Sequence, residues 1–201
     1  MDGIAWAADA MSAAQSRLDT ATQNLANAST DGFRKSRLRG FLSAAGIVLR
    51  RTPEKGQGPL RPTGRDLDLA ITGGGAFRVR NEQGTVVQTR AGAFARDRFG
   101  RLHDSGGRVL MGTRGPLLFP DGAHFDPSGA VVCDGKTLDR LPLPRGSSLR
   151  TGFLESSNVD AIGEMIDVLT AQRSYETAQK VLTAIDQTRE RSATQVAAVK
   201  G

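Results

Sequence analysis

The chain has 201 residues, of which 38% are hydrophobic and 5% aromatic, with 27 Lys and Arg against 21 Asp and Glu. This length suits one or two small domains with a modest core. No apolar run approaches the roughly 18 residues of a membrane-spanning helix, so we expect no membrane insertion. The N-terminus lacks a basic segment followed by an apolar core, so no cleaved secretory signal is expected. A single cysteine, Cys133, excludes an intramolecular disulfide and a cysteine-based zinc site.

The first 30 residues predict a long helix with one apolar stripe. Large apolar residues recur every seven positions, and an alanine follows three positions after each one: Ile4, Met11, Leu18 and Leu25, then Ala7, Ala14, Ala21 and Ala28. This is the a/d pattern of a helix that packs against another helix, and the alanines allow close approach. Gly32 can take the positive φ angle that ends the helix, and Phe33 can pack back on the last turn.

The middle of the chain predicts a connection followed by β structure. Residues 34–65 contain Pro53, Pro59, Pro62 and several glycines, which favour a short amphipathic element and then an extended, irregular connection. Polar and apolar residues alternate in 66–71 and 76–80, and turn signals recur from residue 81 to residue 135. Short strands with such spacing predict a small antiparallel sandwich or barrel-like domain.

A second long helix is predicted near the C-terminus. Asp160 can cap it, and a second apolar stripe follows: Ile162, Met165, Ile166, Leu169, Tyr175, Ala178, Val181, Leu182 and Ile185. The stripe slips between Leu169 and Ala178, so it is not a strict coiled coil. An isolated pair of one-sided helices leaves much apolar surface exposed, which favours burial between subunits.

The predicted fold class is therefore α+β, with long N- and C-terminal helices packing as a coiled-coil-like pair and a small central antiparallel β domain. The expected domains are a terminal helical domain (1–33 and 152–201), an extended connecting region (34–65) and a β-rich outer domain (66–151).

Catalytic and cofactor-binding patterns are not found in the sequence. His103 and His124 have no neighbours that would make either one a catalytic base, and the glycines at 73–75 lack the Gly-Lys-Ser/Thr ending of a phosphate loop. We therefore expect no enzyme activity, no cofactor and no metal. The net charge of +6 admits a polyanionic partner, and a nucleic-acid-binding module using residues 34–65 is the alternative from another class. For these basic residues, a solvated surface is favoured over a nucleic-acid-binding site.

Three groups of motifs resemble the bacterial flagellar rod and hook protein family. The N-terminal group is residues 11–19 and 24–35, the latter reading NLANASTDGFRK. The middle group is 66–77 and 89–94, and the C-terminal group is 152–160, 164–168 and 172–176. The three groups occur in the family's order and cover nearly the whole chain.

The resemblance implies a structural subunit of the flagellar basal-body rod, whose terminal helices form an inner tube with the β domain outside it. It implies export through the flagellar type III apparatus without signal cleavage, stacking across the periplasm, and transmission of torque. The implied partners are further copies, other rod subunits, the export apparatus and the surrounding rings, and not nucleic acid.

Asn24, Asn27 and Asn158 are expected to satisfy backbone groups near the helix ends. The residues expected at the assembly interface are Ile4, Met11, Leu18, Asn24, Leu25, Asn27, Phe33, Asn158, Ile162, Ile166, Leu169, Tyr175 and Leu182.

Different motifs of the sequence indicate different positions along the rod. Residues 115–123 and 134–141 resemble the proximal rod protein, which we slightly favour, whereas 172–187 resemble the distal one. A distal rod or hook–basal-body protein of the same family is the alternative. Residues 141–143 lead almost directly into 150–152, so the outer domain is expected to be smaller than is usual in the family.

Overall fold

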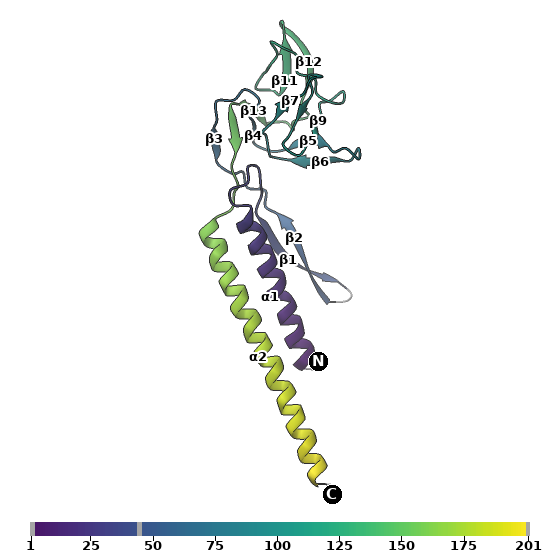
Figure 1. Cartoon of the computed structure of the whole chain (residues 1–201), viewed down its shortest axis with the longest axis vertical. Coiled ribbons are helices and arrows are strands. Elements are labelled where there is room, and N and C mark those ends of the chain that lie inside the picture. The colour runs from purple at the N-terminus through teal and green to yellow at the C-terminus, as the bar shows by residue number, and fades with distance from the viewer. Residues whose placement is uncertain (1–2, 44–45, 200–201) are drawn as a thin grey trace. The chain divides into compact units, whose positions relative to one another are not determined.

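The computed structural model describes the backbone of residues 3–43 and 46–199, and the side chains of residues 3–41 and 48–191. Helices α1 (Gly3–Ala26) and α2 (Ala161–Val199) lie at the two ends of the chain, with only strands and loops described between them (Figure 1). The strands are β1 (Ser36–Ser43), β2 (Gly46–Pro53), β3 (Leu60–Pro62), β4 (Leu69–Thr72), β5 (Phe77–Arg80), β6 (Val86–Thr89), β7 (Ala95–Arg96), β8 (Leu102–His103), β9 (Val109–Leu110), β10 (His124–Phe125), β11 (Ala130–Cys133), β12 (Lys136–Arg140), β13 (Ser148–Thr151) and β14 (Phe153–Glu155). The α+β class with terminal helices and central antiparallel strands is confirmed.

The chain divides into two compact units. The helical unit comprises Met1–Ala26, Lys35–Glu54 and Val159–Gly201, and the β unit comprises Asn27–Arg34 and Lys55–Asn158. Residues 35–54, expected to belong to a connecting region, therefore pack with the helices.

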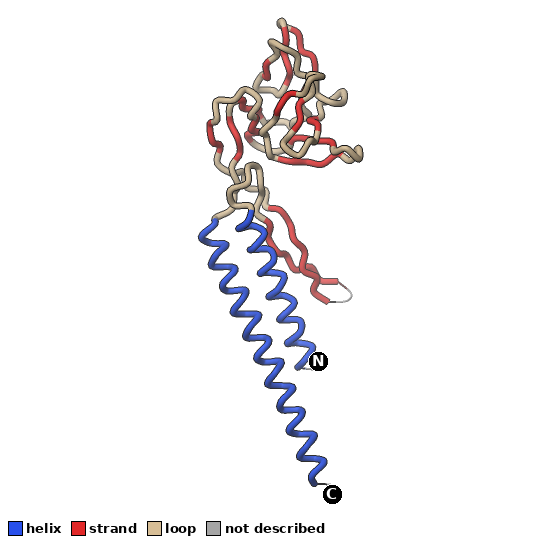
Figure 2. The backbone as a smooth tube through the Cα atoms, in the orientation of Figure 1, coloured by secondary structure: helices blue, strands red, loops and turns tan. Residues whose placement is uncertain are grey.

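In the helical unit, α1 and α2 lie side by side and antiparallel, as Figure 2 shows. A Cβ atom built on Gly3 would lie 3.4 Å from Ile185 Cδ1, and near the other end of α1 the Asn24 amide bonds to Glu164. Asp160 caps α2 as predicted, because its Oδ1 accepts a hydrogen bond from the Ile162 amide at 3.2 Å.

The segment expected to hold a short amphipathic element and then an irregular connection contains a hairpin of β1 and β2. Its strands pair in continuous antiparallel register from Ser36↔Pro53 onward, and β1 runs along α1. Leu38 is half-buried in the helical unit, whereas Phe41 and Val48, which pair with each other, are exposed. Leu38 and Phe41 lie on opposite faces of β1, so apolar residues occur on both faces of the hairpin and the alternation that would have identified the strands is weak.

The β unit is built from small antiparallel sheets. The largest has five strands in the order β6-β5-β9-β8-β7; β10, β11 and β12 form another, and β13 pairs with β4 as β14 does with β3. One core joins them, and its fully buried members include Leu69, Phe77, Phe94, Leu110 and Val131. Phe77 and Phe94 meet edge to face with ring centroids 5.4 Å apart.

Four turns of the β unit share one design. Each starts at an Asp or Asn, whose carbonyl accepts from a glycine amide three residues later at 3.0 Å, and this glycine has a positive φ angle: Asn81–Gly84, Asp97–Gly100, Asp104–Gly107 and Asp126–Gly129. Each opens into a hairpin, because the first residue's amide also bonds the carbonyl four residues on. The turn signals read from the sequence at these positions are confirmed.

Candidate assembly surfaces

The seam between the two helices is formed by small side chains. Ala7, Ala14 and Ala21 of α1 are buried, as are Ala171 and Ala178 of α2. Alanines at the contact let helix axes approach closely. The heptad predicted from the sequence is therefore present in α1. The alanines of the heptad are buried, whereas its large residues are not.

The large residues expected to carry the helix packing lie beside the seam or away from it. The four on α1, Ile4, Met11, Leu18 and Leu25, are half-buried, as are Tyr175 and Leu182 on α2. Ile162, Ile166 and Leu169, which are expected at the assembly interface, are exposed in the single chain and do not pack against α1. At about 100° per residue, these three positions lie on the side of α2 opposite Glu164 and Ala171, which face α1.

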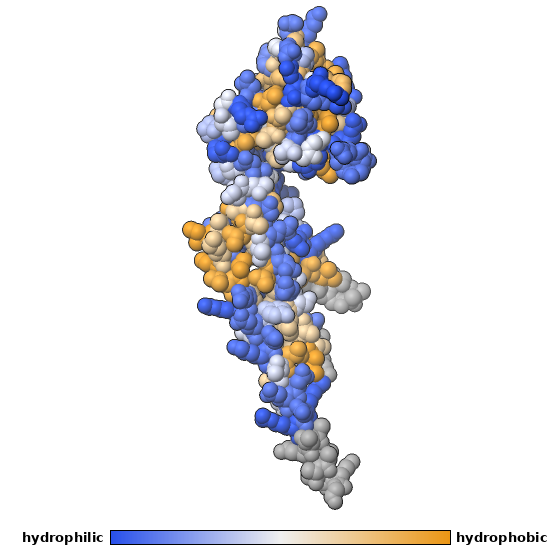
Figure 3. Space-filling view, viewed as in Figure 1, coloured by the Kyte–Doolittle hydropathy of each residue, from blue (hydrophilic) through white to orange (hydrophobic). Residues whose placement is uncertain are grey.

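An exposed apolar stripe results on the outer side of α2. It consists of Ile162, Met165, Ile166 and Leu169, each more than half exposed. In the space-filling view the hydrophobic surface gathers over this part of the helix (Figure 3). A contiguous apolar stripe of this kind marks an interaction surface.

A buried polar junction lies where α1, α2 and β1 meet. Asn24 and Glu164 are each 1% exposed, and Asn24 Nδ2 donates to Glu164 Oε2 at 3.1 Å. The Asn24 amide also bonds both backbone groups of Ser36, at 2.9 Å each, and Lys35 Nζ forms an ion pair with Glu164 Oε1. A groove of about 440 Å³ opens beside this junction, lined also by Arg17.

The three asparagines expected to satisfy backbone groups near the helix ends make three different contacts in the structure. Asn24 bonds the backbone of β1, as described above. Asn27 lies in the turn after α1, where its carbonyl accepts from the Thr30 amide at 3.1 Å. Asn158 Nδ2 donates to the carbonyl of Gly56 at 3.1 Å within the β unit. Phe33, which follows this turn, is half-buried.

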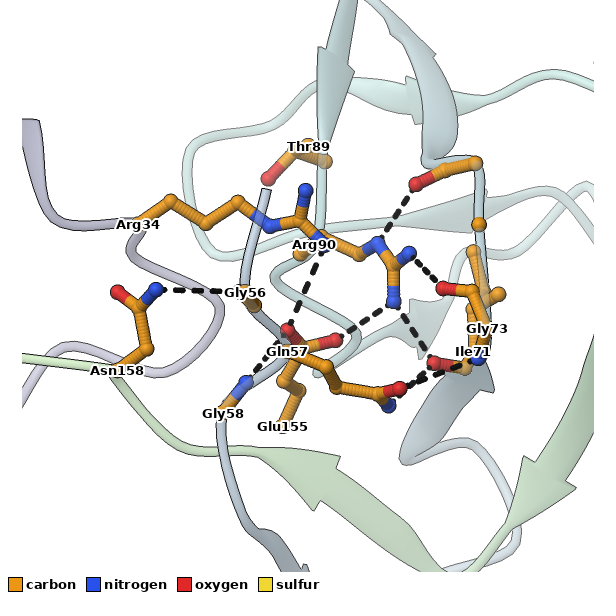
Figure 4. Close-up of polar contacts among 12 residues, drawn as sticks. Arg34, Gly56, Gln57, Gly58, Ile71, Gly73, Thr89, Arg90, Glu155 and Asn158 are labelled. Atoms are coloured by element: carbon orange, nitrogen blue, oxygen red, sulfur yellow. Dashed lines mark hydrogen bonds and ion pairs between the residues drawn. The ribbon is translucent and has the colours of Figure 1, made fainter. Parts of the chain in front are cut away.

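The β unit contains a buried ionic cluster that sequence reasoning missed (Figure 4). Arg90 Nη1 donates to Glu155 Oε2 at 2.8 Å, and both side chains are almost completely buried. The guanidinium also donates to the carbonyls of Ile71 at 2.7 Å and of Gly75 at 2.6 Å, and to that of Gly73. It thereby shapes the glycine turn that the sequence had suggested after β4.

Glu155 has two further neighbours in this cluster. Its Oε1 accepts from the Gly58 amide at 3.2 Å and lies 3.9 Å from Arg34. Burial, and then the charge of Arg90, lower the pKa of Arg34, while Glu155 opposes that shift. The only sequence signal was that Arg90 and Glu155 both lie within the motifs that carry the family resemblance.

Several basic residues of the segment considered for nucleic-acid binding contact partners in their own unit. The arginines that contact an acid or an amide oxygen are Arg34, Arg37, Arg51, Arg61 and Arg65. Arg39 and Arg50 lie directly opposite each other in the hairpin. Within residues 3–43 and 46–199, neither helix is long and apolar enough to cross a membrane, and the described side chains include no His, Cys, Asp and Glu group suited to a metal ion.

Three protein families match the chain in the order of its motifs. Residues 4–34 match the family described as flagella basal body rod protein, residues 70–136 the flagellar hook protein FlgE/F/G D1 domain, and residues 150–196 the flagellar basal body rod FlgEFG protein C-terminal. The three segments contain α1, most of the β unit and most of α2.

Individual relatives agree with these matches. The flagellar basal-body rod protein FlgG of Bacillus subtilis (strain 168) is 30% identical over 240 residues, covering 86% of this chain and 90% of the relative. The rod protein FlgF of Escherichia coli (strain K12) is 28% identical, covering 88% and 92%. The hook protein FlgE of Brucella abortus biovar 1 (strain 9-941) is 38% identical over 114 residues, covering 51% of this chain and 28% of the relative. The chain therefore belongs to the flagellar basal-body rod and hook protein family, a family of structural proteins.

Proposed function

We propose that this chain is a structural subunit of the flagellar basal-body rod, which assembles through its terminal helices into the axial tube that transmits torque. The observation that carries the proposal is the exposed apolar stripe of α2 at residues 162–169, on the side of the helix opposite its contact with α1. Full burial of a water-exposed isoleucine or leucine side chain in an assembly stabilises that assembly by about 1.5–3 kcal/mol.

The assembly interface comprises two kinds of surface. The outer stripe of α2 meets helices of neighbouring copies in coiled-coil-like contacts, and the half-buried large residues of α1 close the edges of these contacts. The overhang of α2 supports contacts beyond the helix pair, because α1 reaches only to about Ile185, whereas α2 continues to Val199.

The finer features of the proposal follow the family. The subunit passes through the flagellar export apparatus without signal cleavage, lies in the part of the rod that spans the periplasm, and contacts the surrounding rings. The resemblance of residues 115–123 and 134–141 to the proximal rod protein supports a position in the proximal rod. In this proposal the outer domain is the part that is shortened. The FlgG comparison supports a shorter chain, because its 240 aligned positions exceed the 201 residues of this chain.

The test uses Leu169→Asp with Leu118→Asp as the matched control. Leu169 is 57% exposed on α2 and Leu118 is 55% exposed in the β unit, so neither substitution buries a charge in the isolated chain. We expect the Leu169 variant to keep the helical content of the monomer but to abolish rod assembly and motility, whereas the Leu118 variant assembles. Motile cells with complete rods made from Leu169→Asp would refute the proposed interface.

Deletion of the gene tests the position along the rod. Basal bodies that lack every rod segment beyond the export apparatus are expected for a proximal subunit. Basal bodies that retain a short proximal rod would instead place the subunit distally.

A further inference from the structure

We infer that Glu164 is the positioning residue that fixes the register of α2 against α1, acting through Asn24 and Lys35. The inference concerns a single chain and does not depend on the proposed role in the rod. Asn24 lies two residues before the end of α1 and Glu164 in the first turn of α2, so their contact sets which turn of one helix faces which turn of the other.

The alanines of the seam do not by themselves select one register. These alanines recur every seven residues, at 7, 14 and 21 on α1 and at 171 and 178 on α2, and the large residues of α1 have the same period. A slip of seven residues moves one helix along the other by about 10 Å and returns alanine to alanine. Apolar contacts are non-directional and distinguish such registers poorly.

The lengths of the helices leave room for such a slip. Helix α1 has 24 residues and α2 has 39, so α1 can be displaced by one heptad toward the end of α2 and still lie against helix along its whole length. The displaced register would place Asn24 opposite Ala171 and would separate it from Glu164. In the observed register, the Glu164 carboxylate receives the Asn24 amide on one oxygen and the Lys35 ammonium on the other.

A buried polar contact of this kind can specify register without adding stability. A single polar residue at a seam position of a coiled coil selects one alignment at a cost in stability, and replacing buried ionic groups by apolar ones is often neutral or stabilising. Without Glu164 both partners keep other contacts, although one Nδ2 hydrogen of the buried Asn24 loses its acceptor. Asn24 keeps both hydrogen bonds to Ser36, and the Lys35 side chain is 20% exposed, so its ammonium can reach water.

Chemical crosslinking in the full chain tests the inference, with Cys133→Ser removing the native thiol. Gly3→Cys is combined with Ile185→Cys to report the observed register, and with Ala178→Cys or Ser192→Cys to report a slip of one heptad in either direction. A short bifunctional maleimide is added to dilute protein, and only products of monomer size are counted. Helical content is followed by circular dichroism.

With Glu164 present, the 3–185 pair should dominate. In Glu164→Leu we expect unchanged helical content and a roughly tenfold rise in the slipped pairs relative to 3–185, the shift that loss of one hydrogen bond to a charged group produces. Glu164→Gln keeps an oxygen acceptor for Asn24 and should restore the 3–185 preference. The inference is overturned if Glu164→Leu crosslinks only through 3–185, or if it loses its helices, since Glu164 would then act on stability and not on register.

Discussion

Replacing Arg90 with leucine removes the guanidinium at the centre of the buried cluster of the β unit. Four acceptors lose their hydrogen bond from Arg90, but the free-energy cost differs among them. The Ile71 carbonyl still accepts from Gln57 Nε2 at 2.8 Å. The glycines at 73 and 75 are exposed, so water can replace the arginine at their carbonyls. The cost therefore falls mainly on Glu155.

The magnitude follows from what remains around Glu155. Its carboxylate is 2% exposed and would retain the Gly58 amide at 3.2 Å and Arg34 at 3.9 Å. Removing one partner of a buried ion pair costs about 3–5 kcal/mol, and the nearby Arg34 places the expected loss at the lower end, about 3 kcal/mol. Adding Glu155→Gln removes the unpaired charge but keeps an acceptor for Gly58, so the double variant should regain most of this loss.

The assay must report on the β unit alone. Trp6 and Tyr175, the single tryptophan and the single tyrosine, both lie in the helical unit, so their fluorescence does not follow β-unit unfolding. Amide hydrogen exchange at Val79, a fully buried residue of β5, reports on unfolding of the β unit. A loss of about 3 kcal/mol should speed this exchange about a hundredfold.

The exposed Arg78 of the same strand supplies the control, since Arg78→Leu should leave the exchange nearly unchanged. Unchanged exchange in Arg90→Leu, or no recovery in the double variant, would refute the reasoning from Glu155.

Two further predictions concern the β unit. Gly92→Ala should destabilise it by about 1–3 kcal/mol, because the new Cβ would lie 1.7 Å from the Leu69 carbonyl oxygen. Urea denaturation measures this loss. Gly74→Ala is the control, because its Cβ would have no neighbour closer than 3.8 Å. The Ser128 hydroxyl, together with backbone amides, lowers the pKa of Asp126 below its ordinary 3.8. The turn should therefore be fully stabilised above pH 3.8 and lose that stability as the pH falls through the lowered pKa. Asp126→Asn should remove this pH dependence of amide exchange, and an identical pH profile in both proteins would contradict it.

Local patterns in the sequence were sufficient for the elements whose structure depends on near neighbours. The seven-residue period predicted α1, Asp160 predicted the start of α2, and short clusters that contain glycine marked the turns of the β unit. In each case the interacting groups lie within a few residues of one another. A capping carboxylate or a glycine with positive φ acts on its own backbone and needs no distant partner.

Tertiary structure decided which of several equivalent faces is buried. The heptad of α1 offers a line of large residues and a line of alanines, and only the approach of α2 buries Ala14 and leaves Leu18 half-buried. The pairings of Arg90 with Glu155 and of Asn24 with Glu164 join residues 65 and 140 positions apart. The sequence by itself determined the helices, the turns and the family. The seam, the β1–β2 hairpin and both buried polar clusters depend on contacts between distant segments, which no local period encodes.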